Sequence, residues 1–204
     1  NRDLSKYELV IFPNTACMSG DEAEKIREYV KNGGNIIATY DTSCYGDSAV
    51  FAKEPQLAEV LGISRIDGAE ELPFDHIQVE ESVFTKGIDQ QLIPSSGLYL
   101  KVIPRKGSKC FMNFRQKQPS RYCDLPEKTE YPFIIMNEYG KGKAVLFPGS
   151  IDATYDSYRF PEYLVIMRNT VELLSTRRIF MDNAITSLFV NVRKKGEAEV
   201  IHLV

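Results

Sequence analysis

Histidine is scarce in this chain, which has only His76 and His202 among its 204 residues. Cysteine and serine nucleophiles in hydrolytic enzymes are activated by a neighbouring base, and histidine is the residue that most often supplies it. Two histidines leave few places where such a base could stand. The sequence therefore offers little support for catalysis by an activated nucleophile.

Paired cysteines are also lacking. Cys17, Cys44, Cys110 and Cys123 are widely and irregularly spaced, and none forms the C-x-x-C pair that is typical of zinc sites and redox dithiols. We expect four free thiols in a reducing compartment, which favours the cytoplasm. We predict no metal and no cofactor.

Long apolar runs and basic clusters are absent as well. No run approaches the roughly 20 residues that span a bilayer, and the N-terminal residues do not resemble a signal peptide. A formal net charge of -3 and a pI near 5.6 leave no basic surface for nucleic acid or an anionic membrane, so neither partner is expected. The chain has no initiator methionine, and we expect it to be a piece of a longer protein.

What the sequence does contain is the material for one ordinary domain with a small appendage, since 43% of its residues are hydrophobic. The run "YELVIFP" is typical of a strand buried on both faces, and "MSGDEAEKIREYVKNGG" predicts a helix with Ser19 and Glu22 as its capping box. With "NIIAT" as the next strand, this makes a right-handed βαβ unit. We predict strands at Glu8–Pro13 and Asn35–Thr39, helices near Asp21–Lys31 and Pro161–Ser175, and buried Ile11, Ile26, Ile37 and Leu146.

The rest of the chain is less regular. A short helix is expected in "EPQLAEVLGI", with Pro55 near its first turn and Gly62 at its end, followed by short strands in "FDHIQVE", "LYLKVIP" and "KCFMNFR". Gln116–Pro132 reads as a surface loop. Phe133–Met136 and Ala144–Phe147 should pair antiparallel. The last long helix should bury Leu164, Met167, Val171 and Leu174, and a final β-hairpin should follow it.

In this order, the motifs "Y-V-K-N-G-G-N-I-I-A-T", "T-S-C-Y-G-D", "LAEVLGI", "EYGKGKAVLFPG" and "RNTVELL" resemble the β-galactosidase trimerisation domain, the middle domain of family 42 and related putative glycoside hydrolases. The resemblance covers roughly Leu4–Ser175. It implies an α/β fold, flavodoxin-like and of the class I glutamine amidotransferase type, built as a three-layer sandwich with a mainly parallel sheet. We expect this domain over residues 1–178, and a truncated all-β domain over 179–204.

The resemblance also implies a role and partners. In such enzymes the domain follows a catalytic (β/α)8 barrel and generally lacks the amidotransferase triad. We therefore predict a non-catalytic assembly or accessory domain of a bacterial glycoside hydrolase. Its expected partners are its own barrel and other subunits in a homo-oligomer, with carbohydrate as a further ligand.

Cys44 is the candidate nucleophile, because it stands on a polar turn after a predicted strand. Amidotransferases place a histidine and a glutamate as H-x-E after a late strand. Here "AVLFP" is followed by "GSIDATYDS", which contains no histidine. We expect Cys44 to be a packed turn residue and keep a cysteine-dependent amidase or amidotransferase as the alternative.

Polar residues follow several predicted strands at the carboxyl edge of the sheet, where open α/β sheets bind ligands. Paired aspartates there could serve glycoside hydrolysis, but aspartate is also a common turn residue. We expect a ligand pocket at this edge, with a carbohydrate as one candidate ligand. Its residues are Asn14, Asp41, Thr42, Ser43, Tyr45, Ser150 and Asp152.

Aromatic residues crowd the segment "ATYDSYRFPEY", which we expect to be a loop before a helix. Tyrosines are enriched at protein interfaces and can also stack on sugars. We favour an interface with another domain or subunit, formed by Tyr155, Tyr158, Phe160 and Tyr163.

Overall fold

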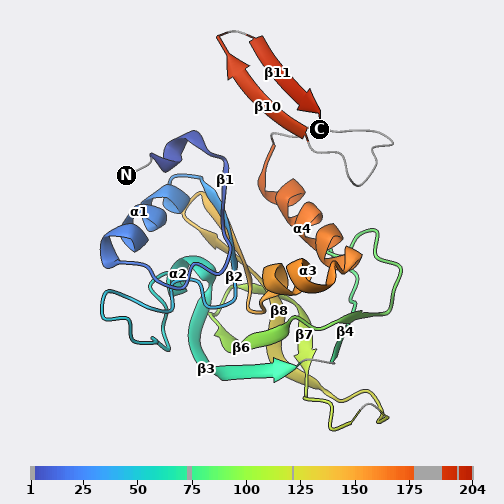
Figure 1. Cartoon of the computed structure of the whole chain (residues 1–204). Coiled ribbons are helices and arrows are strands. Elements are labelled where there is room, and N and C mark those ends of the chain that lie inside the picture. Colours follow the sequence, from blue (N-terminus) through green and yellow to red (C-terminus); the bar gives the residue numbers. More distant parts are fainter. Residues whose placement is uncertain (1–2, 73–74, 121, 177–189, 197, 204) are drawn as a thin grey trace.

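A five-stranded sheet forms the centre of the computed structural model, which describes residues 3–72, 75–120, 122–176, 190–196 and 198–203 (Figure 1). The strand order is β1-β2-β9-β8-β7. β1, β2 and β9 are parallel to one another, whereas β8 and β7 run antiparallel to their neighbours. The α/β class is as expected, and the sheet is mixed. Its strands are β1 (Leu9–Phe12), β2 (Asn35–Thr39), β9 (Gly142–Phe147), β8 (Lys128–Tyr139) and β7 (Lys109–Arg115).

The central strands bury side chains on both faces, because side chains alternate along a strand. On β2, Ile36 and Ala38 join a core with the helices α1 (Gly20–Lys31) and α2 (Ala58–Leu61). Ile37 points into the opposite core, with α3 (Ile151–Tyr158) and α4 (Pro161–Leu174). Helices therefore cover both faces of the sheet. Burial of Ile26, Ile37 and Leu146 is confirmed.

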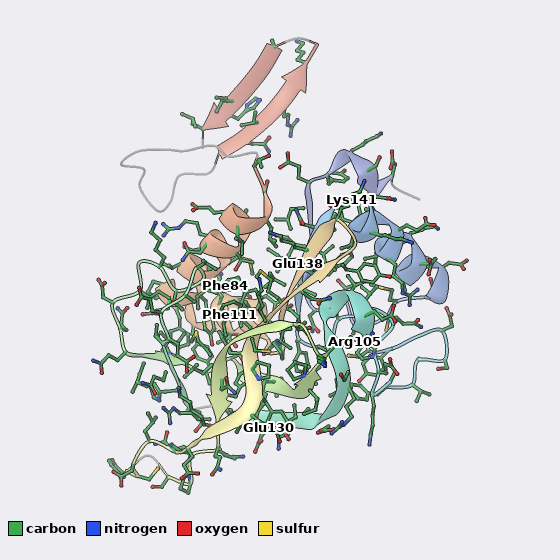
Figure 2. All side chains as sticks on the ribbon, turned by 180° about the vertical axis from the view of Figure 1, so that it is seen from behind. Phe84, Arg105, Phe111, Glu130, Glu138 and Lys141 are labelled. Atoms are coloured by element: carbon green, nitrogen blue, oxygen red, sulfur yellow. The ribbon has the colours of Figure 1, made fainter. Side chains whose placement is uncertain are left out.

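Aromatic packing dominates the α3–α4 side of the sheet. Phe84 and Phe111 lie together in the interior (Figure 2), with ring centroids 4.9 Å apart in an edge-to-face arrangement. Phe114 stacks on Tyr99 at 3.9 Å and meets Phe133 edge-to-face at 5.3 Å. The two edge-to-face contacts are of the kind that ring quadrupoles favour, so the cluster gives this core directional contacts as well as burial.

The sequence signals at α1 are confirmed. Ser19 is the N-cap: its Oγ accepts from the Glu22 amide, and its own amide donates to Glu22 Oε2 at 2.9 Å. The Gly-Lys-Gly hairpin is also confirmed, with Ile135 opposite Leu146 and Met136 opposite Val145.

Smaller elements surround the central sheet. The strands β3 (Ile63–Leu72) and β6 (Gly97–Pro104) pair antiparallel, as do β4 (His76–Gln78) with β5 (Leu92–Pro94). A 3-10 turn, Leu4–Lys6, precedes β1. At the other end, β10 (Val190–Lys195) and β11 (Ala198–Leu203) form the expected hairpin, drawn apart from the main sheet in Figure 1.

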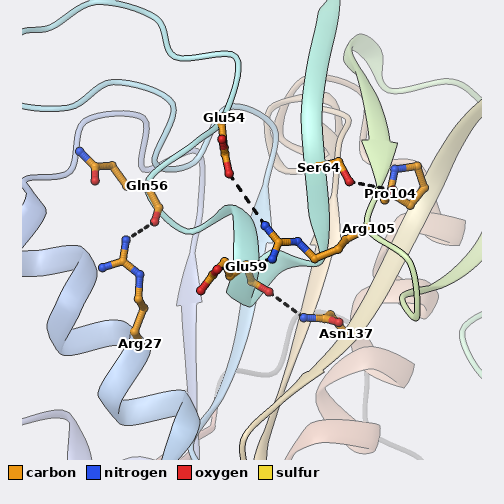
Figure 3. Close-up of polar contacts among 8 residues, drawn as sticks. All are labelled: Arg27, Glu54, Gln56, Glu59, Ser64, Pro104, Arg105 and Asn137. Atoms are coloured by element: carbon orange, nitrogen blue, oxygen red, sulfur yellow. Dashed lines mark hydrogen bonds and ion pairs between the residues drawn. The ribbon is translucent and has the colours of Figure 1, made fainter.

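The short helix α2 is held by side chains from its neighbours (Figure 3). Asn137 of β8 donates its amide Nδ2 to the carbonyl oxygens of Glu59 and Val60, at 2.9 and 3.0 Å. Arg27 of α1 donates to the Gln56 carbonyl at 2.6 Å, and Arg105 forms a 3.4 Å ion pair with Glu59. A four-residue helix cannot satisfy its own terminal carbonyls, so these donors fix its position.

Several expectations are wrong. Ile11 is 44% exposed, because β1 is an edge strand of the sheet and no strand pairs with its outer side among the described residues. The segment before the last helix is itself a helix, α3. In α4, Leu164 faces solvent, and Tyr163 and Ile166 are buried instead. The long strand β8 begins inside the expected loop Gln116–Pro132, and β3 was not expected.

No helix in the described part of the chain is long and apolar enough to cross a membrane.

Candidate functional site

Thr39 is the centre of a polar network at the carboxyl edge of the parallel strands. Its Oγ1 accepts from the Asn14 amide at 2.8 Å and donates to Asp152 Oδ2 at 3.0 Å. These residues follow β1, end β2 and begin α3. One buried hydroxyl therefore connects three segments of the chain at this edge.

Thr42 and Ser43 turn inward at the same edge, and both are buried. Thr42 Oγ1 donates to the Thr39 carbonyl at 2.7 Å and accepts from the Thr15 amide at 3.2 Å. Ser43 Oγ accepts from the Leu57 amide at 3.2 Å. Their hydroxyls hold the loops after β1 and β2 to each other and to α2.

The backbone at this edge is strained. Asn14, Tyr40 and Ser43 have φ values of 44°, 48° and 64°, in the left-handed region that non-glycine residues seldom adopt. Such conformations persist only where the surrounding structure enforces them, and they are common at functional sites. Here the hydrogen bonds of Thr39 and Thr42 provide that enforcement.

Asp41 and Asp152 are the charged groups of this edge. The Oδ1 atom of each is buried and has no hydrogen-bond partner among the described residues. Burial raises the pKa of the Asp41 carboxyl, and the Asp152 charge raises it further. The Asp152 charge therefore destabilises the ionised form of Asp41.

Five of the seven predicted ligand residues lie together at this edge, and Tyr45 and Ser150 lie elsewhere. Tyr45 lies farther along the loop, where it bridges to Cys17 and packs edge-to-face on Phe51 at 5.6 Å. Ser150 donates to the Ser96 carbonyl at 3.0 Å and lines a cavity in which none of the other predicted ligand residues takes part. The five predicted residues at this edge are Asn14, Asp41, Thr42, Ser43 and Asp152; together with Thr39 they make up the carboxyl-edge network.

Cys44 is buried in the turn after this network, with Sγ 3.9 Å from the Thr42 carbonyl oxygen. Burial raises the pKa of the Cys44 thiol to about 12, with a smaller contribution from the Asp41 charge. A nucleophilic cysteine needs a lowered pKa, because the thiolate is the reactive form. At neutral pH, Cys44 is a protonated thiol. All four cysteines are free.

The predicted interface residues lie on α3, on α4 and in the turn between them. Tyr158 is 68% exposed and stacks on Phe160, with centroids 5.4 Å apart and planes 14° from parallel. The Arg159 guanidinium lies over the Tyr155 ring, with its Cζ atom 5.3 Å from the ring centroid. Tyr163 is only 2% exposed, and its hydroxyl donates to the Pro94 carbonyl at 2.9 Å.

A cavity of about 510 Å³ lies between α3 and the chain around β5 and β6. Asp75 and Ser95 line it, and sequence reasoning missed both. Neither follows a predicted strand of the central sheet, so the carboxyl-edge rule could not find them. The described residues contain no group of three or more histidine, cysteine or acidic side chains that could hold a metal ion.

The comparisons with known proteins agree on one family. The model described as the β-galactosidase trimerisation domain matches residues 1–155. The chain is similar to the β-galactosidase LacA of Lactobacillus acidophilus, with 29% identity over 145 residues that cover 70% of this chain and 19% of LacA. It is also similar to the β-galactosidase BgaP of Planococcus sp. (strain L4), with 27% identity over 158 residues, 75% of this chain and 21% of BgaP.

Among solved structures, the β-galactosidase from Bacillus circulans sp. alkalophilus superposes with a TM-score of 0.74 at 17% identity, over 98% of this chain and 27% of that chain. The likeness concerns the fold. The chain spans about a fifth of the length of the curated relatives it matches.

Proposed function

The chain belongs to the β-galactosidase trimerisation domain family, and from this premise we propose that it is the non-catalytic assembly module of a larger glycoside hydrolase. The observation that carries the proposal is the family match over residues 1–155, together with a matched region that covers only about a fifth of each curated relative. A trimerisation domain implies an oligomer and a catalytic domain elsewhere in the parent protein. The partners in this proposal are the parent's own catalytic barrel and further copies of the chain.

The proposed fold class is flavodoxin-like, of the class I glutamine amidotransferase type. Three adjacent parallel strands with helices on both faces support it. The proposed domain boundary lies at residue 178. The separate two-stranded sheet of β10 and β11 supports a second, all-β unit over 179–204; residues 177–189 lie outside the described part of the chain.

The proposed assembly surface is the aromatic patch formed by Tyr155, Tyr158, Phe160 and Tyr163. Tyr158 and Phe160 support it best, because an exposed tyrosine stacked on a half-buried phenylalanine presents a rigid apolar surface of the kind that anchors interfaces. Tyr163 supports the patch from the interior, because its buried ring packs edge-to-face on Phe160 with centroids 6.1 Å apart.

The carboxyl-edge residues fit a structural role better than catalysis. Their hydroxyls bond to backbone groups of the neighbouring loops, and the Cys44 thiol is protonated at neutral pH. Ligand binding at this edge stays a prediction.

Sedimentation velocity of the full-length parent tests the assembly role. Tyr158→Ala should weaken association by about 2 kcal/mol, the loss typical of a central aromatic anchor. Tyr122→Ala is the matched control, because Tyr122 is almost wholly exposed on another loop; its oligomer should equal that of the wild type. A monomeric parent, or equal association in both variants, would overturn the proposal.

A further inference from the structure

Ser95 is a buried hydroxyl without a partner. Its side chain lines the cavity beside α3, the residue is 6% exposed, and its Oγ has no hydrogen-bond partner among the described residues. Leaving a buried polar group unsatisfied is costly, so native structures rarely do so without a reason. A ligand that bonds to Oγ in this cavity would supply one.

The wall that carries Ser95 is firmly held. Ser150 and Thr154 donate their hydroxyls to the Ser96 carbonyl, at 3.0 and 2.5 Å, and Tyr163 donates to the Pro94 carbonyl at 2.9 Å. Both residues that flank Ser95 in the chain are thus tied to α3 or α4. A preorganised wall lowers the entropy lost when a ligand binds.

Asp75 provides a buried acceptor in the same cavity. The Ser95 amide donates to the Asp75 carbonyl at 2.7 Å, so the two residues are directly connected. Asp75 Oδ1 accepts from the Gln118 amide at 2.7 Å, and Oδ2 is the carboxylate's second acceptor. Burial raises the pKa of this carboxyl, with Gln118, His76 and Lys117 opposing that rise and Glu70 adding to it.

The aromatic pair forms the rim. Tyr158 and Phe160 line the cavity as well, and their rings, stacked on each other, add apolar surface next to buried polar groups. Flat faces with C–H groups pack on such rings, while hydroxyls at the edge of the same molecule reach polar partners.

We propose that this cavity binds a neutral polyhydroxylated ring of the pyranose type, with hydroxyls on Ser95 and Asp75 and one face against Tyr158 and Phe160. Hydroxyls both donate and accept, so they satisfy the acceptor Asp75 and both functions of the Ser95 hydroxyl, whereas an ammonium group only donates. A volume of about 510 Å³ holds one or two such rings. The site is distinct from the carboxyl-edge network and goes beyond the assembly role.

Titration of the ¹⁵N-labelled 204-residue chain with methyl β-D-galactopyranoside and methyl β-D-glucopyranoside, followed by amide chemical shifts, tests the site. We expect saturable shifts at Ser95, Gly97 and Thr154, with a Kd on the order of 1 mM for either or both sugars. Ser95→Ala and Asp75→Asn should each weaken binding about tenfold, as for loss of one hydrogen bond.

The controls keep folding and binding separate. Ser95→Ala removes an unpartnered hydroxyl and should melt no lower than the wild type. Asp67→Asn changes an exposed carboxylate outside the cavity and should leave binding unchanged. Shifts that do not saturate, shifts confined to other residues, undiminished binding in both cavity variants, or stronger shifts with methylammonium chloride would each overturn the proposal.

The same variants distinguish this inference from the assembly role. Ser95→Ala alters a buried atom and should leave sedimentation of the full-length parent unchanged. Tyr158→Ala should weaken both sugar binding and association. Loss of binding in Ser95→Ala with an intact oligomer therefore supports the cavity site independently of the interface.

Discussion

Gly142 lies where the β8–β9 hairpin passes against the end of α1. A Cβ atom added there would stand 2.1 Å from the Gly34 carbonyl oxygen and 2.4 Å from that of Val30. Both obstacles are backbone atoms, which cannot rotate away as a side chain can. The closeness of helix and hairpin therefore depends on the missing side chain.

Gly142→Ala should lower the free energy of unfolding by about 3 kcal/mol, because strain or a shift of α1 must accommodate the methyl group. Urea denaturation followed by circular dichroism measures this. Gly20→Ala is the control: no atom lies within 4 Å of its added Cβ, and its stability should stay within about 0.5 kcal/mol of the wild type. Equal stability of the two variants would contradict the packing argument.

Asp41 should make stability depend on pH. Its pKa in the folded chain is raised above the ordinary value of 3.8, chiefly by burial and further by Asp152. Between the unfolded and folded pKa values the folded state binds more protons, so stability falls as pH rises through that interval and the full penalty is present above it.

Asp41→Asn removes this penalty and should stabilise the chain at pH 7 by about 0.5 kcal/mol. The gain should shrink as the pH is lowered through the raised pKa of Asp41, because protonation then removes the charge from the wild-type carboxyl as well. Urea midpoints at pH 7 and pH 4.5 measure it. The control is Asp67→Asn, which removes the exposed ion pair with Arg65 and should give no gain in stability at either pH. If Asp41→Asn were less stable than the wild type at pH 7, the ionised Asp41 carboxylate would not be destabilising.

At the scale of elements, α2 is a helix that its neighbours stabilise. Asn137→Ala removes both hydrogen bonds to its last carbonyls and should cost about 1–2 kcal/mol of unfolding free energy. Arg105→Ala removes only exposed ion pairs and should cost less than about 0.5 kcal/mol. Thermal melts of the two variants show which substitution destabilises the chain more. A larger loss for Arg105→Ala would contradict the view that Asn137 is the main support of α2.

The elements that sequence reasoning found are those with local signals. Ser19 and Glu22 cap α1 through their own side chains, and Gly62 ends α2 in the left-handed conformation that glycine adopts freely. α3 gives no such signal, since Ser150 makes no side-chain capping bond and its hydroxyl goes to Ser96. β3 was missed because most of its outer residues are polar and its pairing with β6 is irregular.

The candidate sites show the same division. Asp41 and Asp152 were predicted to meet because the carboxyl ends of parallel strands share an edge. Thr39, the buried hydroxyl that joins the edge, was overlooked as the last residue of an apolar strand. Ser95 and Asp75 come together through the pairing of β4 with β5, which tertiary packing decides.

At the scale of the whole molecule, the C-terminal hairpin forms a sheet of its own. β10 pairs only with β11 among the described strands. A two-stranded sheet is marginally stable alone, so it should add little to the stability of the main domain. This supports the proposed boundary at residue 178.

A chain that ends at residue 178 should melt within about 2 °C of the full 204-residue chain in differential scanning calorimetry. Amide protons of the hairpin should exchange rapidly in the full chain, and those of β2 slowly. A melting temperature lowered by more than about 2 °C in the shortened chain would show that the hairpin belongs to the main domain.

The pairing of β2 with β9, Ile36 opposite Ala144, has a consequence for the order of synthesis. A ribosome delivers β1, α1 and β2 early, yet the strand that covers the inner edge of β2 follows only after the whole irregular middle of the chain. Until then the core around Ile37 lacks Val145 and Phe147, the two residues that β9 contributes to it. The nascent chain therefore carries β2 with one edge unpaired through much of its translation, and unpaired edges are prone to aggregation. We expect a chaperone that binds the chain during this period to raise the yield of native protein.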